Sequence, residues 1–302
     1  MISNNFYEYM SAANPLLPEI PIKGFGLELL DNNFGWIPFD LSKELQTPYI
    51  ATSPSLLAGY IHLKPNQVFE FKPNSAAVFG CVLQGAGTCQ VNNETFNIAL
   101  NDVLSLPGCL PITFTTKSEE LVLYCVNDAP LLNRLHAKPD TCSPLVPLLY
   151  KSEDIFAKIE EIDAESANAD RNRDAIIYGH QDVYIGKGMT PSVWAATVKV
   201  NVGEEALAHR HNSVAIDIVI DCAEGAYSCL GWKLDKFNQI IDPIIVPWKK
   251  GSAFVTPPGI WHSHHNKSNK PAFVTAVQDA TLHEYLRTLD IQFTHRRIEN
   301  RI

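Results

Sequence analysis

Short alternations of apolar and polar residues fill two separate parts of the chain. In the first part, runs of β-branched and aromatic residues lie at 79–83, 88–91, 95–98 and 121–126. In the second part, similar runs lie at 193–200, 215–220, 226–232, 253–256 and 272–277. Gly, Asn and Pro separate the runs. Many short strands divided by turn residues predict a β-barrel or β-sandwich in each part.

Two other stretches have helical spacing instead. Ser152 can cap a helix in which Ile155, Ile159 and Ile162 recur at intervals of four and three residues. A second helix is predicted at about 282–289. The fold class is therefore expected to be all-β with a few short helices.

The two β-rich parts resemble each other in sequence. At an offset of 138 residues, Ala77 corresponds to Ala215 and Gly87 corresponds to Gly225. A longer loop in the second part then aligns Pro107 with Pro258. Such internal repetition predicts two copies of one fold.

These patterns divide the chain into segments. The expected segments are an N-terminal arm at 1–50, a first barrel at 51–130, a linker with a helix at 131–190, a second barrel at 191–280, and a C-terminal helix and tail at 281–302. Prolines interrupt the arm, and such arms often cover a sheet edge or a subunit contact. The end of the linker, at 164–174, is polar and is expected to lie on the surface.

Composition narrows the possible partners and the compartment. The net charge of −9 and the lack of basic runs argue against nucleic acid as a partner. No apolar run reaches about 18 residues, and residues 1–21 do not resemble a secretory signal, so no membrane contact is expected. The seven cysteines include no CxxC pair, which favours free thiols in the cytoplasm over disulfides.

The histidines supply the candidate chemistry. Five of the ten lie between positions 209 and 265. His209 and His211 are two residues apart, so on a strand they point to the same side. His262 follows a Pro-Gly turn and can supply a third imidazole if its strand pairs beside the first. Three neutral imidazoles suit iron, zinc, copper or nickel and leave open positions on the metal.

This combination resembles the cupin superfamily. The first cupin motif, HxH followed by a glycine, matches 209–225, and the second, a Pro-Gly turn before a histidine, matches 258–262. The resemblance implies a double cupin, with two double-stranded β-helix barrels. Many cupins add a glutamate ligand after HxH, but Ala215 and Ile216 stand at those positions here. This departure argues against the oxalate-handling and germin-like branches.

Within this superfamily, the strings HRHNS, EGAY and TPPGIWHSHHN are similar to those of the gentisate 1,2-dioxygenase group of bicupins. The resemblance implies His209, His211 and His262 as ligands of iron(II), with manganese, nickel or zinc as other metals. It implies His264, the second histidine of WHxH, as a catalytic residue that handles protons. The implied reaction is extradiol-type cleavage of a small aromatic substrate by dioxygen, in a homo-oligomer.

One position departs from this group near the expected pocket. Asp217 stands where the group has an arginine that binds a carboxylate. An aspartate there would repel an aromatic carboxylate and attract an amine or a hydroxyl, unless it faces solvent. Tyr227, Trp261 and Gln278 are further candidates for substrate binding. Arg210 is expected to face away from the metal.

The first barrel is expected to bind no metal. Phe71, Pro73 and Pro111 occupy the positions that correspond to the three histidine ligands, and none of them can coordinate a metal. Two other functions remain open for the whole chain. One is a non-oxidative metal-dependent enzyme, such as a lyase or hydrolase, and the other is a small-molecule-binding bicupin without turnover.

Overall fold

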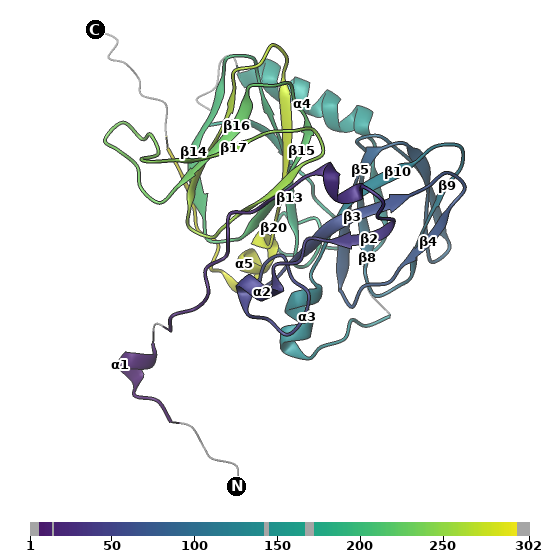
Figure 1. Ribbon diagram of the computed structural model, residues 1–302, viewed down its shortest axis with the longest axis horizontal. Helices are drawn as coiled ribbons and strands as arrows, with labels where there is room; N and C mark the ends of the chain where they lie inside the picture. The colour runs from purple at the N-terminus through teal and green to yellow at the C-terminus, as the bar shows by residue number, and fades with distance from the viewer. Residues whose placement is uncertain (1–5, 14, 142–144, 167–171, 295–302) are drawn as a thin grey trace.

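The computed structural model describes residues 6–13, 15–141, 145–166 and 172–294. Two β-barrels lie side by side, one drawn in blue and teal and the other in green and yellow (Figure 1). An arm at the N-terminus runs along both barrels before the first one begins. The prediction of an all-β protein with short helices is therefore confirmed.

The first barrel consists of two antiparallel sheets. Its strands are β2 Gly35–Pro38, β3 Leu57–Leu63, β4 Val68–Phe71, β5 Ala77–Gln84, β6 Ala86–Val91, β7 Glu94–Ala99, β8 Val103–Pro107, β9 Ile112–Thr116, β10 Leu121–Asn127 and β11 Leu148–Tyr150. The larger sheet has the order β11-β8-β5-β10-β3-β2, and the smaller one has the order β4-β9-β6-β7.

The second barrel is built in the same way. Its strands are β1 Gly24–Phe25, β12 Asp174–Ile177, β13 Trp194–Val200, β14 Glu205–His211, β15 Ala215–Asp221, β16 Ala226–Gly231, β17 Ile244–Pro247, β18 Ala253–Thr256, β19 Trp261–Asn266, β20 Ala272–Gln278 and β21 Ile291–Phe293. One sheet has the order β1-β18-β15-β20-β13-β12, and the other has the order β17-β16-β19-β14-β21.

Most helices are short, and all except α1, which lies out on the N-terminal arm, lie between or beside the barrels (Figure 1). They are α1 Tyr9–Ala12, the 3-10 helix η1 Leu27–Leu30, α2 Ser42–Leu45, α3 Ala129–Leu135, α4 Ser152–Ser166 and α5 Ala280–Leu286. Helix α4 begins at the predicted cap. Helix α5 begins two residues before its predicted start and ends at Leu286, because Arg287 takes a left-handed conformation (φ 59°) that closes the helix. None of the described helices is both long and apolar enough to cross a membrane.

The internal repeat is visible in the structure. Strand β10 and helix α3 of the first barrel recur 151 residues later, residue for residue, as strand β20 and helix α5 of the second. In each barrel the helix follows the last long strand directly. The match between the two halves therefore extends from sequence to tertiary structure.

The two larger sheets pack face to face and form a shared core. Tyr60, Phe79 and Tyr124 from the first barrel lie against Ile216 and Ile218 from the second, and all five are buried. Hydrogen bonds cross the same contact, since the Tyr124 hydroxyl donates to the carbonyl of Ile216 at 3.0 Å. Burial of this much apolar surface holds the barrels together.

The interior of the first barrel is filled with apolar side chains. Phe71, at the position that corresponds to His209, is buried in a cluster with Phe114, Leu104 and Ile61. The cluster holds no histidine or carboxylate, and burial raises the pKa of its two thiols, Cys89 and Cys125, so both stay protonated and are poor metal ligands. Within the described part of the chain, the histidine triad of the second barrel is the only group of three or more side chains placed to hold a metal ion.

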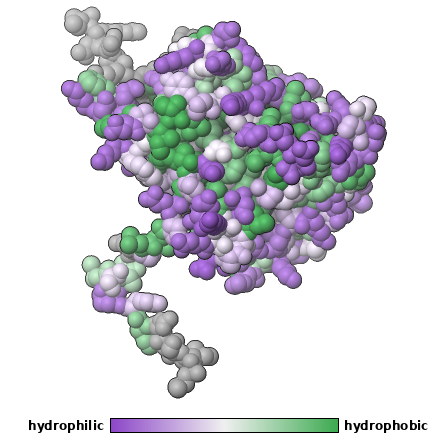
Figure 2. Space-filling view, in the orientation of Figure 1, coloured by the Kyte–Doolittle hydropathy of each residue, from purple (hydrophilic) through white to green (hydrophobic). Residues whose placement is uncertain are grey.

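The N-terminal arm covers a sheet edge in each barrel. Its strand β1 pairs with β18 of the second barrel, and its strand β2 pairs with β3 of the first. This placement agrees with the expected covering of sheet edges. Apolar side chains remain exposed on the arm and over β17, where Ile244 and Ile245 are about half exposed (Figure 2).

The polar segment before the second barrel departs from its prediction. The stretch 172–174 leads directly into β12, which pairs with β13 at the edge of the second barrel. Residues 172–177 therefore belong to this barrel, and some of their side chains turn inward. Residues 167–171 of the same stretch lie outside the described part of the chain.

Candidate metal centre

A bulge in β14 sets which way its histidines face. Ala206 pairs with His264 and His209 pairs with His262, so two residues of β14 lie opposite the single residue Ser263. Such a bulge reverses the alternation of a strand at one point. It places His209 on the same face of the sheet as His262, inside the barrel. It also leaves the carbonyl of Leu207, one of the two bulged residues, available to another partner.

His209, His211 and His262 converge at the base of a cavity. One ring nitrogen from each lies within 4.8 Å of the other two, and all three side chains are buried. The Nδ1 atoms of two rings face backbone carbonyls, from His211 to Ser213 at 2.8 Å and from His262 to Ile260 at 3.1 Å. These bonds fix each ring and direct its Nε2 lone pair inward, as a metal ligand requires.

The protonation state also suits a metal. Burial lowers the pKa of His211 to about 4, and it lowers the pKa of His209 and of His262 well below the usual value. All three rings are therefore neutral at physiological pH, as coordination of a metal requires. His209 Nδ1 and His211 Nε2 are buried without a hydrogen-bond partner, which is costly unless something else binds them. The triad could therefore hold a metal ion.

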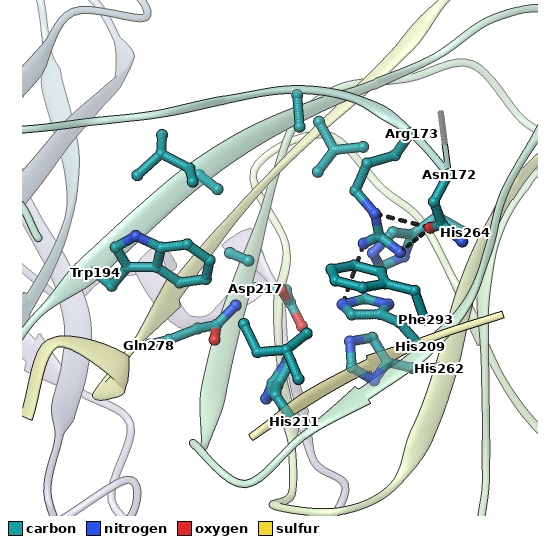
Figure 3. Close-up of a pocket in the computed structure, with 16 residues that line it drawn as sticks. Asn172, Arg173, Trp194, His209, His211, Asp217, His262, His264, Gln278 and Phe293 are labelled. Carbon is teal, nitrogen blue, oxygen red and sulfur yellow. Dashed lines mark hydrogen bonds between the residues drawn. The ribbon is translucent and has the colours of Figure 1, made fainter. Parts of the chain in front are cut away.

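Two side chains that the sequence analysis missed lie beside the triad (Figure 3). Arg173, just before β12, has its Nη1 3.1 Å from His209 Nε2. Phe293 of β21 stacks on the His209 ring, with centroids 5.7 Å apart. Strand β21 pairs with β14 so that Phe293 lies opposite His209. The predictions missed them because both lie outside the two motifs, in segments assigned to the linker and the tail.

His264 lies in the cavity wall next to the triad, where the sequence placed it. Its Nδ1 is 2.8 Å from Ser228 Oγ, and Trp248 Nε1 donates to the same oxygen at 2.8 Å. Burial, and then the positive charge of Arg173, lower the pKa of His264 to about 3. The ring is therefore a neutral imidazole that is held by Ser228.

The triad opens into a cavity of about 400 Å³. Most of its wall is apolar, formed by Ala175, Ile177, Ala196, Val198, Ala276 and Ile291. The polar groups are few and come from separate strands (Figure 3). Among them, Trp194 Nε1 is buried and has no hydrogen-bond partner. A small ring-bearing compound fits such a site by size and chemistry.

Asp217 and Gln278 line this cavity, as the sequence predicted. Asp217 faces inward because its neighbours Ile216 and Ile218 face the shared core. It accepts a hydrogen bond of 2.6 Å from Thr256 Oγ1, and burial raises its pKa to about 7. Gln278 Oε1 accepts a bond from Ser213 Oγ at 2.8 Å, which leaves its amide NH₂ as the group that can face a ligand.

Tyr227 and Trp261 were expected to bind substrate, but neither residue lines the cavity. The structure therefore corrects this expectation. Each adjoins a residue that faces the cavity side, and neighbouring residues on a strand face opposite sides. Tyr227 stacks on His265 on the outer surface of the barrel, with ring centroids 4.9 Å apart. Trp261 lies under the guanidinium of Arg210, which faces outward as expected. The alternation that predicted the triad could have excluded both.

Comparisons in sequence find distant relatives, and no protein-family model matches the chain. A gentisate 1,2-dioxygenase of Ralstonia sp is 31% identical over 84 residues, which are 28% of this chain and 20% of that protein. A 5-nitrosalicylic acid 1,2-dioxygenase of Bradyrhizobium sp is 24% identical over 148 residues, 47% of this chain and 64% of that protein. Each match spans less than two thirds of the relative's length.

Comparisons of structure cover nearly the whole chain. A salicylate 1,2-dioxygenase from Pseudaminobacter salicylatoxidans superposes with a TM-score of 0.73 at 13% identity, over 95% of this chain and 92% of the other. A structure of that enzyme described as adducts with gentisate gives 0.73 at 14%, over 94% and 87%. An oxalate decarboxylase gives 0.54 at 12%, over 88% and 78%. The protein therefore has the bicupin fold, and it resembles the gentisate and salicylate 1,2-dioxygenases.

Proposed function

We propose that the protein is an iron(II)-dependent dioxygenase that cleaves the ring of a small aromatic substrate. The observation that carries this proposal is the buried triad, whose His209 and His211 each keep one nitrogen without a partner. The bicupin resemblance to ring-cleaving enzymes supports it. Bound iron(II) would supply redox chemistry and open coordination positions at the base of the cavity.

The residues of the cavity favour a flat aromatic substrate. The wall is mostly apolar, and aromatic rings from Trp194 and Phe293 contribute to it. An apolar wall excludes water, which strengthens every polar contact inside. A ring held there would lie beside the triad, with its substituents turned to the few polar groups.

Those polar groups indicate the substituents. Arg173 is a cation and can hold an anionic group, whereas Asp217 is an acid and accepts a hydrogen bond from an amine or a hydroxyl. The Trp194 Nε1 group is a donor without a partner and can bind an oxygen of the substrate. We therefore propose an aromatic acid that carries a hydroxyl or amino group on its ring.

His264 would move a proton during the reaction. The ring nitrogen that does not bond Ser228 would exchange a proton with a hydroxyl of the substrate. Ser228 keeps the ring from turning. The expected homo-oligomer and cytoplasmic location belong to the same proposal.

Metal content and oxygen uptake test the proposal together. Protein purified without oxygen should carry about one iron per chain, and the double variant His209→Ala/His262→Ala should carry none. His265→Ala is the matched control, because His265 is close in sequence but lies on the outer surface. Hydroxylated and aminated aromatic acids should then cause oxygen uptake by the iron-loaded wild type.

The other outcomes point to the two alternatives. Turnover without oxygen would indicate a lyase or hydrolase that uses the metal as a Lewis acid. Tight binding of aromatic acids without turnover would indicate a binding protein. A wild type that takes up no metal after reconstitution with iron(II) would overturn the dioxygenase proposal.

A further inference from the structure

The guanidinium of Arg173 forms a hydrogen bond with one ring nitrogen of His209. Its Nη1 lies 3.1 Å from His209 Nε2. A guanidinium carries only N–H donors, so Nε2 must be the acceptor and its lone pair is engaged. The proton of the neutral ring is then on Nδ1, which is buried and has no partner.

The rest of the chain holds Arg173 in this position. Its Nη2 donates to the Leu207 carbonyl at 3.1 Å, which the bulge in β14 leaves available. Its Nε donates to Asn172 Oδ1 at 3.1 Å. Its guanidinium also lies over the ring of Phe293, 5.4 Å from the centroid. The contact with His209 is therefore part of a built arrangement.

The hydrogen bond between Arg173 and His209 is incompatible with coordination of a metal ion by His209. A metal on Nε2 would take the lone pair that now accepts from Arg173. A metal on Nδ1 would move the ring proton to Nε2, where it would face the N–H groups of the guanidinium. A neutral imidazole thus has no tautomer that serves both the metal and Arg173.

We propose that Arg173 exchanges its hydrogen-bond partner when metal binds. Metal entry displaces the guanidinium from His209, and the released cation turns into the cavity to bind the anionic group of the substrate. This inference rests on the metal site of the proposed function. Because linkage is reciprocal, an anionic aromatic ligand should strengthen metal binding as much as metal strengthens binding of the ligand.

Titration of the metal-free protein with cobalt(II), followed by its visible absorption, tests the exchange without any turnover. Arg173→Met should bind cobalt(II) about tenfold more tightly than the wild type, since no hydrogen bond to His209 has to be broken. Arg173→Lys keeps the charge but lacks the planar guanidinium that reaches Leu207 and Asn172 together. Its cobalt(II) affinity should therefore be close to that of Arg173→Met. Arg210→Met is the matched control on the outer face and should match the wild type.

Salicylate, as an anionic aromatic probe, provides the second measurement. It should tighten cobalt(II) binding to the wild type several-fold and leave binding to Arg173→Met unchanged. Equal cobalt(II) affinity in wild type and Arg173→Met would overturn the exchange and leave the metal site intact. Wild-type affinity in Arg173→Lys would assign the effect to charge and also overturn it. A wild type that binds no cobalt(II) would overturn the metal site itself.

Discussion

Asp128 and Asp279 occupy matching positions in the two barrels, and each accepts a hydrogen bond from a serine next to the other barrel's first long strand. Ser192 donates to Asp128 and Ser55 donates to Asp279, both at 2.6 Å. The second oxygen of each carboxylate accepts a backbone N–H of its own barrel. The two contacts are related by the internal repeat, so they join the barrels symmetrically.

Removal of either serine should weaken the contact between the two barrels. Ser55→Ala and Ser192→Ala each remove the side-chain donor from one oxygen of a buried carboxylate, so each should lower the free energy of unfolding by about 1–3 kcal/mol. Burial raises the pKa of both aspartates, and the serine bonds oppose that rise. The loss should therefore be larger at pH 8, where more of the carboxylate is ionised, than at pH 5. Urea unfolding at pH 5 and pH 8 measures the loss of free energy of unfolding, with Ser118→Ala at an exposed position as the control. Equal losses at the two pH values would contradict the prediction.

Asp217 should make the stability of the metal-free protein depend on pH. Its pKa is about 7 in the folded state, raised by burial from an ordinary 3.8. The folded protein therefore holds this proton more tightly than the unfolded chain, and stability is lost as the pH rises from about 4 to 7. Asp217→Asn removes this loss, so it should be roughly 2–4 kcal/mol more stable than the wild type at pH 8 and about equal at pH 4. Urea unfolding measures the difference in free energy of unfolding between Asp217→Asn and the wild type, and a difference that stays constant with pH would contradict the prediction. Asp31→Asn, at the surface, is the control.

Local patterns account for what the sequence predicted correctly. Alternation and turn residues predict the strands of each barrel, and the spacing of His209 and His211 on one strand places both on one face. The Pro-Gly turn before His262 marks the start of the strand that supplies the third ring. These features depend on residues close in sequence, so no knowledge of the fold is needed to see them.

The missed residues depend on pairing between distant segments. Arg173 enters the cavity only because β12 adds to the sheet edge, and Phe293 enters only because β21 pairs with β14. The bulge that frees the Leu207 carbonyl is set by the pairing with β19, which no local pattern reveals. The stretch around Arg173 is polar, so composition alone indicated a surface position.

Metal binding should persist at unusually low pH. A protonated imidazole cannot coordinate a metal, so protons compete with the metal below the pKa of each ligand. Burial lowers these pKa values in the metal-free protein, for His211 to about 4, so competition should begin only at more acidic pH. The cobalt(II) affinity should therefore stay nearly constant from pH 8 to about 5.5. A midpoint near 6.5, as for exposed histidines, would contradict the burial of the triad.

Replacement of His264 should separate catalysis from metal binding. His264→Gln keeps a polar side chain in the wall but cannot exchange a proton, so kcat for oxygen uptake should fall by about 10²- to 10⁴-fold. The iron content should remain at one per chain, because the nitrogens of the triad belong to other residues. Ser228→Ala keeps the imidazole but removes its hydrogen bond at Nδ1, so the ring can turn and kcat should fall by a smaller factor. If His264→Gln turned over the substrate at the wild-type rate, proton transfer would have to be assigned to another group in the cavity.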